Sequence, residues 1–174
     1  ELTASLGVPG PFARVVRDAA GLARAVASFA APPVLKADGL CGGKGVFLPA
    51  TFAECLAQGE ALLSGQLGPA GRTLVVEERL IGVEASLFFA CHGESLLALP
   101  HARDHKRACD GDCGPNTGGM GAVSPNGAVS PAVVEEVAAQ IVRPTLAELS
   151  RRGTPFVGFL FVGLMLTDTG PRLL

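Results

Sequence analysis

Residues 34–48 read Val34-Leu35-Lys36-Ala37-Asp38-Gly39-Leu40-Cys41-Gly42-Gly43-Lys44-Gly45-Val46-Phe47-Leu48. This is a basic, glycine-rich loop between two short apolar runs, and the runs predict two strands that the loop joins. Glycines let backbone N–H groups turn toward an anion at close range, and the two lysines add mobile positive charge. The stretch therefore predicts a strand–loop–strand phosphate site, for which a triphosphate is the natural ligand.

Two better-known phosphate loops do not fit this stretch. A P-loop needs G-x-x-x-x-G-K-[ST] before a helix, but only three residues separate Gly39 from Gly43, and Gly45 stands where the metal-binding hydroxyl should be. A dinucleotide fingerprint also leads into a helix, whereas Gly45 is followed by strand-like residues 46–48. The alternative that stays open from this loop alone is a flexible glycine hairpin with two solvated lysines.

The bulk composition describes a globular chain. Its 174 residues are 48% hydrophobic, enough for one domain or two small lobes. The formal net charge of −2 provides no global basic field that would attract nucleic acid or an anionic membrane. No apolar run approaches the roughly 20 residues that span a bilayer. We expect a cytoplasmic protein that binds small molecules, and neither nucleic acid nor a membrane.

The five cysteines form an odd, widely spread set, which predicts reduced thiols and no disulfide framework. A zinc site at Cys109, Cys113 and His105 is disfavoured, because C-x3-C is a poor zinc knuckle and no second pair follows.

Hydrophobic periodicity and capping residues predict a mixed chain of helices and antiparallel strands, an α+β fold. Helices are expected at 18–30, at 51–63 after the capping box Thr51-Phe52-Ala53-Glu54, and at 130–152 with a kink at Pro144. The second of these helices should bury Phe52, Cys55, Leu56 and Leu62. Strands are expected at 11–16, 33–37, 73–78, 83–90, 95–99 and 156–166. The turn at 167–171 is typical of a hairpin, whose second strand we expect to continue past Leu174.

Two further clusters carry candidate chemistry. Glu77-Glu78-Arg79-Leu80 ends a strand whose backbone could read an adenine edge, and Glu84 could accept bonds from ribose hydroxyls. The alternative is a charged hairpin rim. Residues 104–121 gather acid, base, amide and hydroxyl groups, in which glycine amides suit a phosphate or carboxylate and Asp104 suits an amine. The alternative there is a solvated loop.

These residues resemble a known family. The motifs are Lys36-Ala37-Asp38-Gly39-Leu40, Gly42-Gly43-Lys44-Gly45-Val46, Glu77-Glu78, Gly82 with Glu84 and Ser86, Asp104-His105-Lys106-Arg107, Gly114-Pro115-Asn116-Thr117-Gly118-Gly119-Met120-Gly121, Gly158-Phe159-Leu160 and Gly163-Leu164-Met165. Together they resemble the phosphoribosylamine-glycine ligases, also called glycinamide ribonucleotide synthetases, which are ATP-grasp enzymes of purine biosynthesis. The resemblance implies an ATP-grasp fold of two α+β lobes whose antiparallel sheets grip ATP between them.

The resemblance also implies roles for particular residues. Lys36 and Lys44 would be catalytic and would contact ATP phosphates, and Gly42, Gly43, Lys44 and Gly45 would form a closing lid. Glu77, Glu78, Arg79 and Leu80 would hold adenine, and Glu84 the ribose. Asp104, Lys106, Asn116, Thr117 and Gly118 would line the side of the two small substrates, glycine and 5-phosphoribosylamine. The implied products are glycinamide ribonucleotide, ADP and phosphate, formed through a glycyl phosphate.

The resemblance further implies a partial ATP-grasp domain. Residues 33–99 would form the ATP-binding lobe with its lid, and residues 1–32 and 100–174 would belong to the second lobe. The family's magnesium ligands, which could also take manganese, are expected just beyond Leu174, so no metal ligand is expected in 1–174. Cys41, Arg103 and Phe161 depart from the family pattern.

Two rival interpretations stay open. One is another ATP-grasp carboxylate-amine ligase, and the other is a nucleotide-binding piece, inactive alone, of a longer protein that is fused to other purine-pathway domains.

Overall fold

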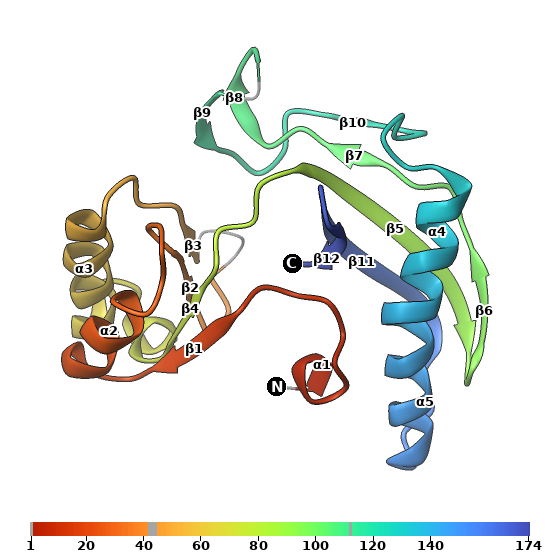
Figure 1. Cartoon of the computed structure of the whole chain (residues 1–174), viewed down its shortest axis with the longest axis horizontal. Helices are drawn as coiled ribbons and strands as arrows, with labels where there is room; N and C mark the ends of the chain where they lie inside the picture. Colours follow the sequence, from red (N-terminus) through yellow and green to blue (C-terminus); the bar gives the residue numbers. More distant parts are fainter. Residues whose placement is uncertain (1, 42–44, 112) are drawn as a thin grey trace. The chain divides into compact units, whose positions relative to one another are not determined.

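The computed structural model describes residues 2–41, 45–111 and 113–174, with 115 and 116 described by their backbone alone. The chain divides into two compact units, and each has its own core. Unit 1 comprises Glu1–Gly10 and Ile81–Leu174, and unit 2 comprises Pro11–Leu80. Each combines helices with an antiparallel sheet, which confirms the α+β prediction (Figure 1).

The boundaries of these units differ from those of the expected lobes. The expected lobes are residues 33–99 for one, and residues 1–32 with 100–174 for the other. Strand β1 (Ala13–Val16) pairs with β4 (Leu74–Glu77), which places the first helix-and-strand segment in unit 2. Strand β5 (Val83–His92) pairs with β11 (Val157–Thr167), which places residues 83–92 in unit 1. These pairings join distant segments, so local periodicity does not reveal them.

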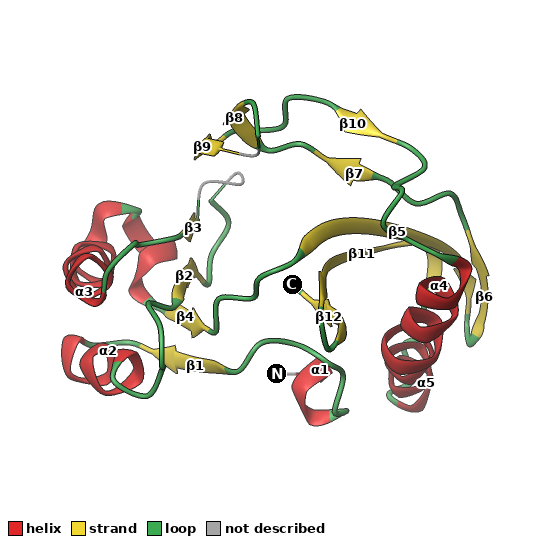
Figure 2. Cartoon of the chain, turned by 45° about the horizontal axis from the view of Figure 1, so that its top comes forward, coloured by secondary structure: helices red, strands yellow, loops and turns green. Residues whose placement is uncertain are grey.

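Unit 2 is a four-stranded antiparallel sheet with helices on one face (Figure 2). The strand order is β1-β4-β2-β3, in which β2 is Val34–Ala37 and β3 is Val46–Phe47. The helical segments are α2 (Ala19–Val26), α3 (Phe52–Ala61), the π-helical η1 (Leu62–Gln66) and the 3-10 turn η2 (Gly68–Arg72). The fully buried residues of the core are Leu22, Leu35, Cys55, Leu62, Leu74 and Val76.

The predicted caps of unit 2 are confirmed. Asp18 accepts a bond from the Gly21 N–H at 2.6 Å at the start of α2. Thr51 accepts one from the Glu54 N–H at 3.1 Å, and the Glu54 carboxylate accepts the Ala50 N–H at 2.8 Å, one residue earlier than in a standard capping box. The expected burial of Phe52 is wrong, because as the first residue of α3 its side chain is 40% exposed.

Unit 1 is built on a second four-stranded antiparallel sheet, in the order β12-β11-β5-β6. Its other strands are β6 (Ser95–Ala98) and β12 (Gly170–Leu173), and α1 (Leu2–Ser5) begins the chain. One nearly continuous helix covers one face of this sheet and consists of α4 (Pro131–Val137), η3 (Ala138–Val142) and α5 (Arg143–Arg151). The fully buried core side chains include Leu87, Phe89, Val137, Val142, Leu146 and Leu164.

The long helix of unit 1 begins and ends as the sequence predicts. Ser130 accepts a bond from the Val133 N–H at 3.3 Å, Pro131 follows in the first turn, and Gly153 ends the helix with a φ of +75°. The expected irregularity near Pro144 is the π-helical η3, which lies immediately before α5. The predicted hairpin at 167–171 is confirmed by the pairing of β11 with β12.

The polar segment from residue 100 to 130 has more regular structure than expected. It contains two small antiparallel pairs, β7 (Arg103–Asp104) with β10 (Ala122–Val123) and β8 (Arg107–Cys109) with β9 (Cys113–Asn116). The five cysteines are free, as predicted. Within the described ranges, no helix combines the length and the apolar character that crossing a membrane requires.

Candidate functional site

The flanks of the glycine-rich loop are two strands of unit 2, as predicted. Strands β2 and β3 pair antiparallel, with Lys36 opposite Val46, and the Ala37 N–H donates to the Gly45 carbonyl at 2.8 Å. The predicted lid residues Gly42, Gly43 and Lys44 lie outside the described residues. The structure therefore confirms the strand–loop–strand arrangement at the two ends of the loop.

Two glycines of this loop have packing reasons for lacking a side chain. A Cβ on Gly39 would lie 2.6 Å from the Cα of Ala70, and one on Gly45 would lie 2.9 Å from the Cβ of Cys41. Both distances are shorter than side chains tolerate. Close packing thus requires glycine at these positions.

Lys36 forms an ion pair inside unit 2. Its Nζ lies 2.6 Å from Oε2 of Glu77, and the two side chains are 27% and 15% exposed. Lys36 lies on β2 and Glu77 on the neighbouring β4, so the sheet brings together a predicted phosphate ligand and a predicted adenine-side residue. Glu77 fixes the lysine head group and offsets part of its charge, while the ammonium keeps donors for a further anion.

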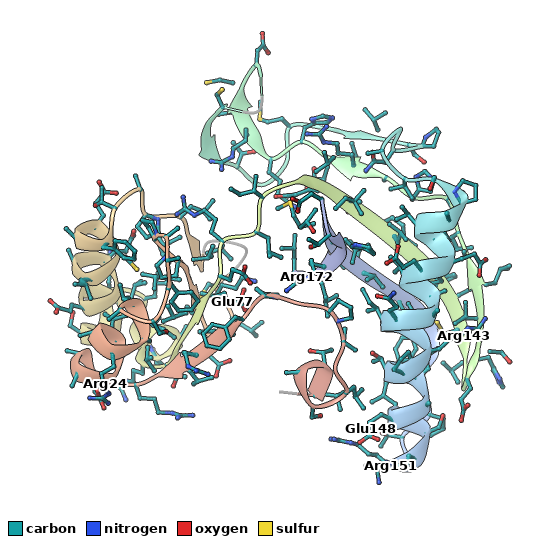
Figure 3. The ribbon with its side chains drawn as sticks, viewed as in Figure 1. Arg24, Glu77, Arg143, Glu148, Arg151 and Arg172 are labelled. Carbon is teal, nitrogen blue, oxygen red and sulfur yellow. The ribbon has the colours of Figure 1, made fainter. Side chains whose placement is uncertain are left out.

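Hydrogen bonds hold Glu78 and Arg79, which follow Glu77 (labelled in Figure 3), against other segments of unit 2. The Glu78 N–H donates to the Phe12 carbonyl at 2.8 Å, and the Glu78 carboxylate accepts the Phe12 N–H at 3.3 Å. Arg79 donates through Nη2 to the Pro49 carbonyl, and its buried Nε has no hydrogen-bond partner among the described residues. The N–H of Glu78 is therefore already hydrogen-bonded within unit 2. Leu80 is the last residue of unit 2.

Unit 1 gathers a second charged cluster at the start of β5. Lys106 Nζ lies 2.8 Å from Oε2 of Glu84 and 3.9 Å from Oδ2 of Asp104. The Lys106 and Glu84 side chains are 45% and 43% exposed, so the pair is accessible to solvent and to ligands. The structure thus brings the predicted ribose carboxylate into contact with two predicted substrate residues. One cation between two carboxylates can offer donors to a carboxylate or phosphate and acceptors to an amine.

A network of backbone bonds fixes the loop that carries Lys106. The Lys106 carbonyl accepts bonds from the Thr117 N–H at 2.7 Å and the Thr117 hydroxyl at 2.9 Å. That hydroxyl in turn accepts the Gly119 N–H at 3.1 Å. A Cβ on Gly119, where φ is +117°, would lie 3.2 Å from the Asp104 carboxylate. The turn therefore keeps Gly119 beside Asp104, and Gly118 next to it is exposed.

Four of the five predicted substrate residues are described with their side chains, and the fifth, Asn116, by its backbone alone. Asp104, Lys106, Thr117 and Gly118 share the same part of unit 1. Asn116 pairs with Arg107 through its backbone in the β8–β9 hairpin, and its side chain lies outside the described residues.

Sequence reasoning missed Asn126 and His101. Asn126 is 5% exposed and is the buried polar residue among those that the structure describes. Its Nδ2 donates to the Glu84 carbonyl at 3.2 Å, and its Oδ1 accepts the Ala128 N–H at 3.0 Å. Its own N–H donates to Nδ1 of His101 at 3.0 Å. The sequence around Asn126, Ser-Pro-Asn-Gly, signals only a turn, so nothing in it reveals this anchor.

Asn126 also borders a pocket of unit 1. The pocket has a volume of about 330 Å³ and is lined by residues that include Val83, Arg103, His105 and Asn126. It lies beside the strand that carries Glu84. In the described ranges, no three His, Cys, Asp or Glu side chains are arranged to hold a metal ion.

The two α+β units, each built on a four-stranded antiparallel sheet, form an ATP-grasp domain, as the family model and the solved structure described next show. The model of the family "Phosphoribosylglycinamide synthetase, ATP-grasp (A) domain" matches residues 1–174. The chain belongs to this family.

Proteins named phosphoribosylamine–glycine ligase share much of the sequence. A phosphoribosylamine–glycine ligase of Mesorhizobium japonicum is 49% identical over 144 residues, which cover 83% of this chain and 34% of that protein. One of Rhizobium meliloti is 43% identical over 174 residues, 100% of this chain and 41% of that protein. The crystal structure of the Thermotoga maritima ligase is similar with a TM-score of 0.87 at 33% identity, over 99% of this chain and 44% of that one.

The chain therefore spans 34% to 41% of the length of these two curated relatives.

Proposed function

We propose that the protein containing this chain ligates glycine to 5-phosphoribosylamine with the cleavage of ATP. The products are glycinamide ribonucleotide, ADP and phosphate, and the intermediate is glycyl phosphate. The observation that carries the proposal is the family match over residues 1–174. The cluster of Glu84, Asp104, Lys106 and Thr117 supports it, because these groups suit both an amine and a carboxylate.

The proposed chemistry has two steps. The glycine carboxylate attacks the γ-phosphorus and releases ADP, and the amine of phosphoribosylamine then displaces phosphate from the acyl carbon. Lys36 contributes by neutralising negative charge on the phosphates, and Glu77 holds its ammonium in place. Lys106 and Asp104 orient the carboxylate and the amine on the substrate side.

Magnesium-ATP is part of the proposal for the whole protein. When bound, the metal neutralises phosphate charge. We assign it no ligand among residues 2–41, 45–111 and 113–174, where no three His, Cys, Asp or Glu side chains are arranged to hold a metal ion. Cytoplasmic location, the absence of nucleic-acid and membrane partners, and fusion to other purine-pathway domains remain expectations.

The test is ADP release by the complete protein with magnesium-ATP, glycine and phosphoribosylamine generated in situ, omitting each substrate in turn. ADP release that requires both substrates supports the ligase. ADP release that ignores either of them contradicts it and favours another ATP-grasp ligase.

A further inference from the structure

Two of the five cysteines are directly opposite each other in the strand register of the β8–β9 hairpin of unit 1. Cys109 on β8 is the direct antiparallel partner of Cys113 on β9. Both side chains are exposed and both are free thiols. The sequence showed only two thiols in a polar loop, and the strand register is what pairs them.

The spacing of paired strands suits a disulfide. Residues directly opposite each other in an antiparallel pair have Cα atoms roughly 4.5–5.5 Å apart, and disulfides join Cα atoms roughly 4.4–6.8 Å apart. Opposed side chains also project from the same face of a regular pair, so this register suits a bridge between the two sulfur atoms.

The Cys109 thiol lies beside a glycine in an irregular part of the ladder. The ladder is irregular between Arg107 and Cys109, and Gly114, with φ of +81°, lies beside the Cys109 side chain. A Cβ on Gly114 would lie 3.0 Å from the Cys109 sulfur, so the missing side chain is what leaves this position to the thiol. The Cys113 thiol donates to the Gly111 carbonyl at 3.3 Å, on the exposed tip of the hairpin.

The other cysteines differ in accessibility. Cys55 and Cys91 are buried, and burial raises the pKa of the Cys55 thiol to about 11 and also raises that of Cys91. Cys41 is of intermediate exposure. Since exchange requires an accessible thiolate, the hairpin pair is the accessible dithiol of this chain.

We propose that Cys109 and Cys113 are a reversible modification site that low-molecular-weight disulfides, of the oxidised glutathione class, close into an intramolecular disulfide. One cysteine thiolate attacks the small disulfide, forms a mixed disulfide and releases one small thiol. The second thiolate attacks the protein sulfur of that mixed disulfide and releases the other small thiol. One S–S bond breaks and one forms, and the two protein thiol protons leave with the released thiols.

The closed disulfide would fix strands that lead directly into the charged cluster. Arg107 already ties the hairpin together by donating to the Gly114 carbonyl at 2.8 Å. The next bonds along the chain are those of Thr117 to the Lys106 carbonyl. Oxidation therefore stiffens the hairpin that begins immediately after Lys106 and ends immediately before Thr117. This part of the inference does not depend on the proposed ligase activity.

The experiment equilibrates the complete protein in oxidised and reduced glutathione, quenches with acid, and reads thiols by alkylation and mass spectrometry. We expect a species two hydrogen atoms lighter, in which Cys109 and Cys113 are lost to alkylation together, and full recovery with dithiothreitol. The Cys109→Ser and Cys113→Ser variants should each stop at a mixed disulfide with glutathione. The matched control Cys41→Ser should behave as the unmodified protein does.

Three results would overturn the proposal. One is independent glutathione adducts on both cysteines of the unmodified protein. Another is that the Cys109→Ser protein still forms a species two hydrogen atoms lighter, because a different pair of cysteines would then be responsible. The third is the absence of any oxidised species at glutathione ratios that oxidise a model dithiol peptide.

Discussion

At the scale of single residues, the ion pair of Lys36 and Glu77 makes the most direct prediction about activity. Lys36→Ala removes a cation from the phosphate side of the proposed site, so we expect kcat/KM for ADP release to fall by about 10²-fold. The fall should appear mainly in kcat, because charge on the transferring phosphoryl group develops in the transition state. Steady-state kinetics of the complete protein measure both constants.

Two variants serve as controls for Lys36. Lys36→Arg keeps the charge and should retain more activity than Lys36→Ala. Glu77→Gln removes the partner and keeps the lysine, so its loss should be smaller. Turnover unaffected by Lys36→Ala would remove this residue from the mechanism.

Glu148 predicts a particular pH dependence of stability. Hydrogen bonds from Arg151 and Arg152 lower the pKa of its carboxyl from 4.5 to about 2 (Figure 3). A carboxyl with a depressed folded-state pKa stabilises the fold above its unfolded-state pKa, and this contribution disappears as the pH falls toward about 2. Glu148→Gln, which cannot titrate, should therefore show a shallower loss of stability between about pH 4.5 and 2.

Urea unfolding monitored by circular dichroism at several pH values compares the two proteins. The carboxyl pKa can also be measured by NMR. Parallel pH profiles of the two proteins would show that the arginines do not hold this carboxylate in solution.

At the scale of elements, the loop after β10 is anchored to β5 by Asn126. Asn126→Ala leaves the Glu84 carbonyl and the Ala128 N–H without their partner, and we expect a loss of stability of about 1–3 kcal/mol. His101→Ala removes the acceptor for the Asn126 N–H. His101→Asn should restore this hydrogen bond, because the asparagine oxygen takes the place of Nδ1 as the acceptor. Thermal unfolding and amide exchange of residues 126–128 provide the measurement.

A double-mutant cycle of Asn126→Ala and His101→Ala tests whether the two act together. Coupled residues give a non-additive double variant. Asn126→Ala keeps the backbone N–H that donates to His101, so the cycle reports on the Asn126 side-chain bonds to the Glu84 carbonyl and the Ala128 N–H. Equal exchange in His101→Ala and His101→Asn would contradict the anchor.

Helix α3 approaches α2 closely at Gly59. A Cβ there would lie 2.5 Å from Cδ2 of Leu22, which is fully buried. Gly59→Ala should therefore destabilise unit 2 by about 1–3 kcal/mol despite the better helix propensity of alanine. Adding Leu22→Val should recover part of the loss. The matched control is Gly127→Ala, where a Cβ meets nothing within 4 Å. A more stable Gly59→Ala protein in chemical denaturation would contradict this account.

Elements whose signals are local could be predicted from the sequence. Asp18, Thr51 and Ser130 cap their helices because a capping bond needs only residues two or three positions away. Contacts set by tertiary packing could not be predicted. The bond of Asn126 to Glu84 spans 42 positions, and the pairing of Cys109 with Cys113 depends on a strand register that no periodicity indicates.

At the scale of the whole molecule, the sequence correctly predicted an ATP-grasp α+β chain but placed its internal boundaries elsewhere. Residues 11–80 form one continuous unit because β1 pairs with β4 in the same sheet as β2. The second unit closes when β11 pairs with β5 along ten positions of register. The sequence of β11 carries no local signal that identifies β5 as its partner, so tertiary packing decides which sheet β11 joins.

The two separate cores predict that each unit responds to its own core substitutions. Leu74→Ala empties a fully buried position of unit 2, and Leu164→Ala does the same in unit 1, each at a cost of about 2–5 kcal/mol. Native-state amide exchange should therefore accelerate in β2 and β4 with the first substitution, and in β5 and β11 with the second. Equal acceleration in both sheets from either substitution would show a single cooperative unit and would contradict the independence of the two cores.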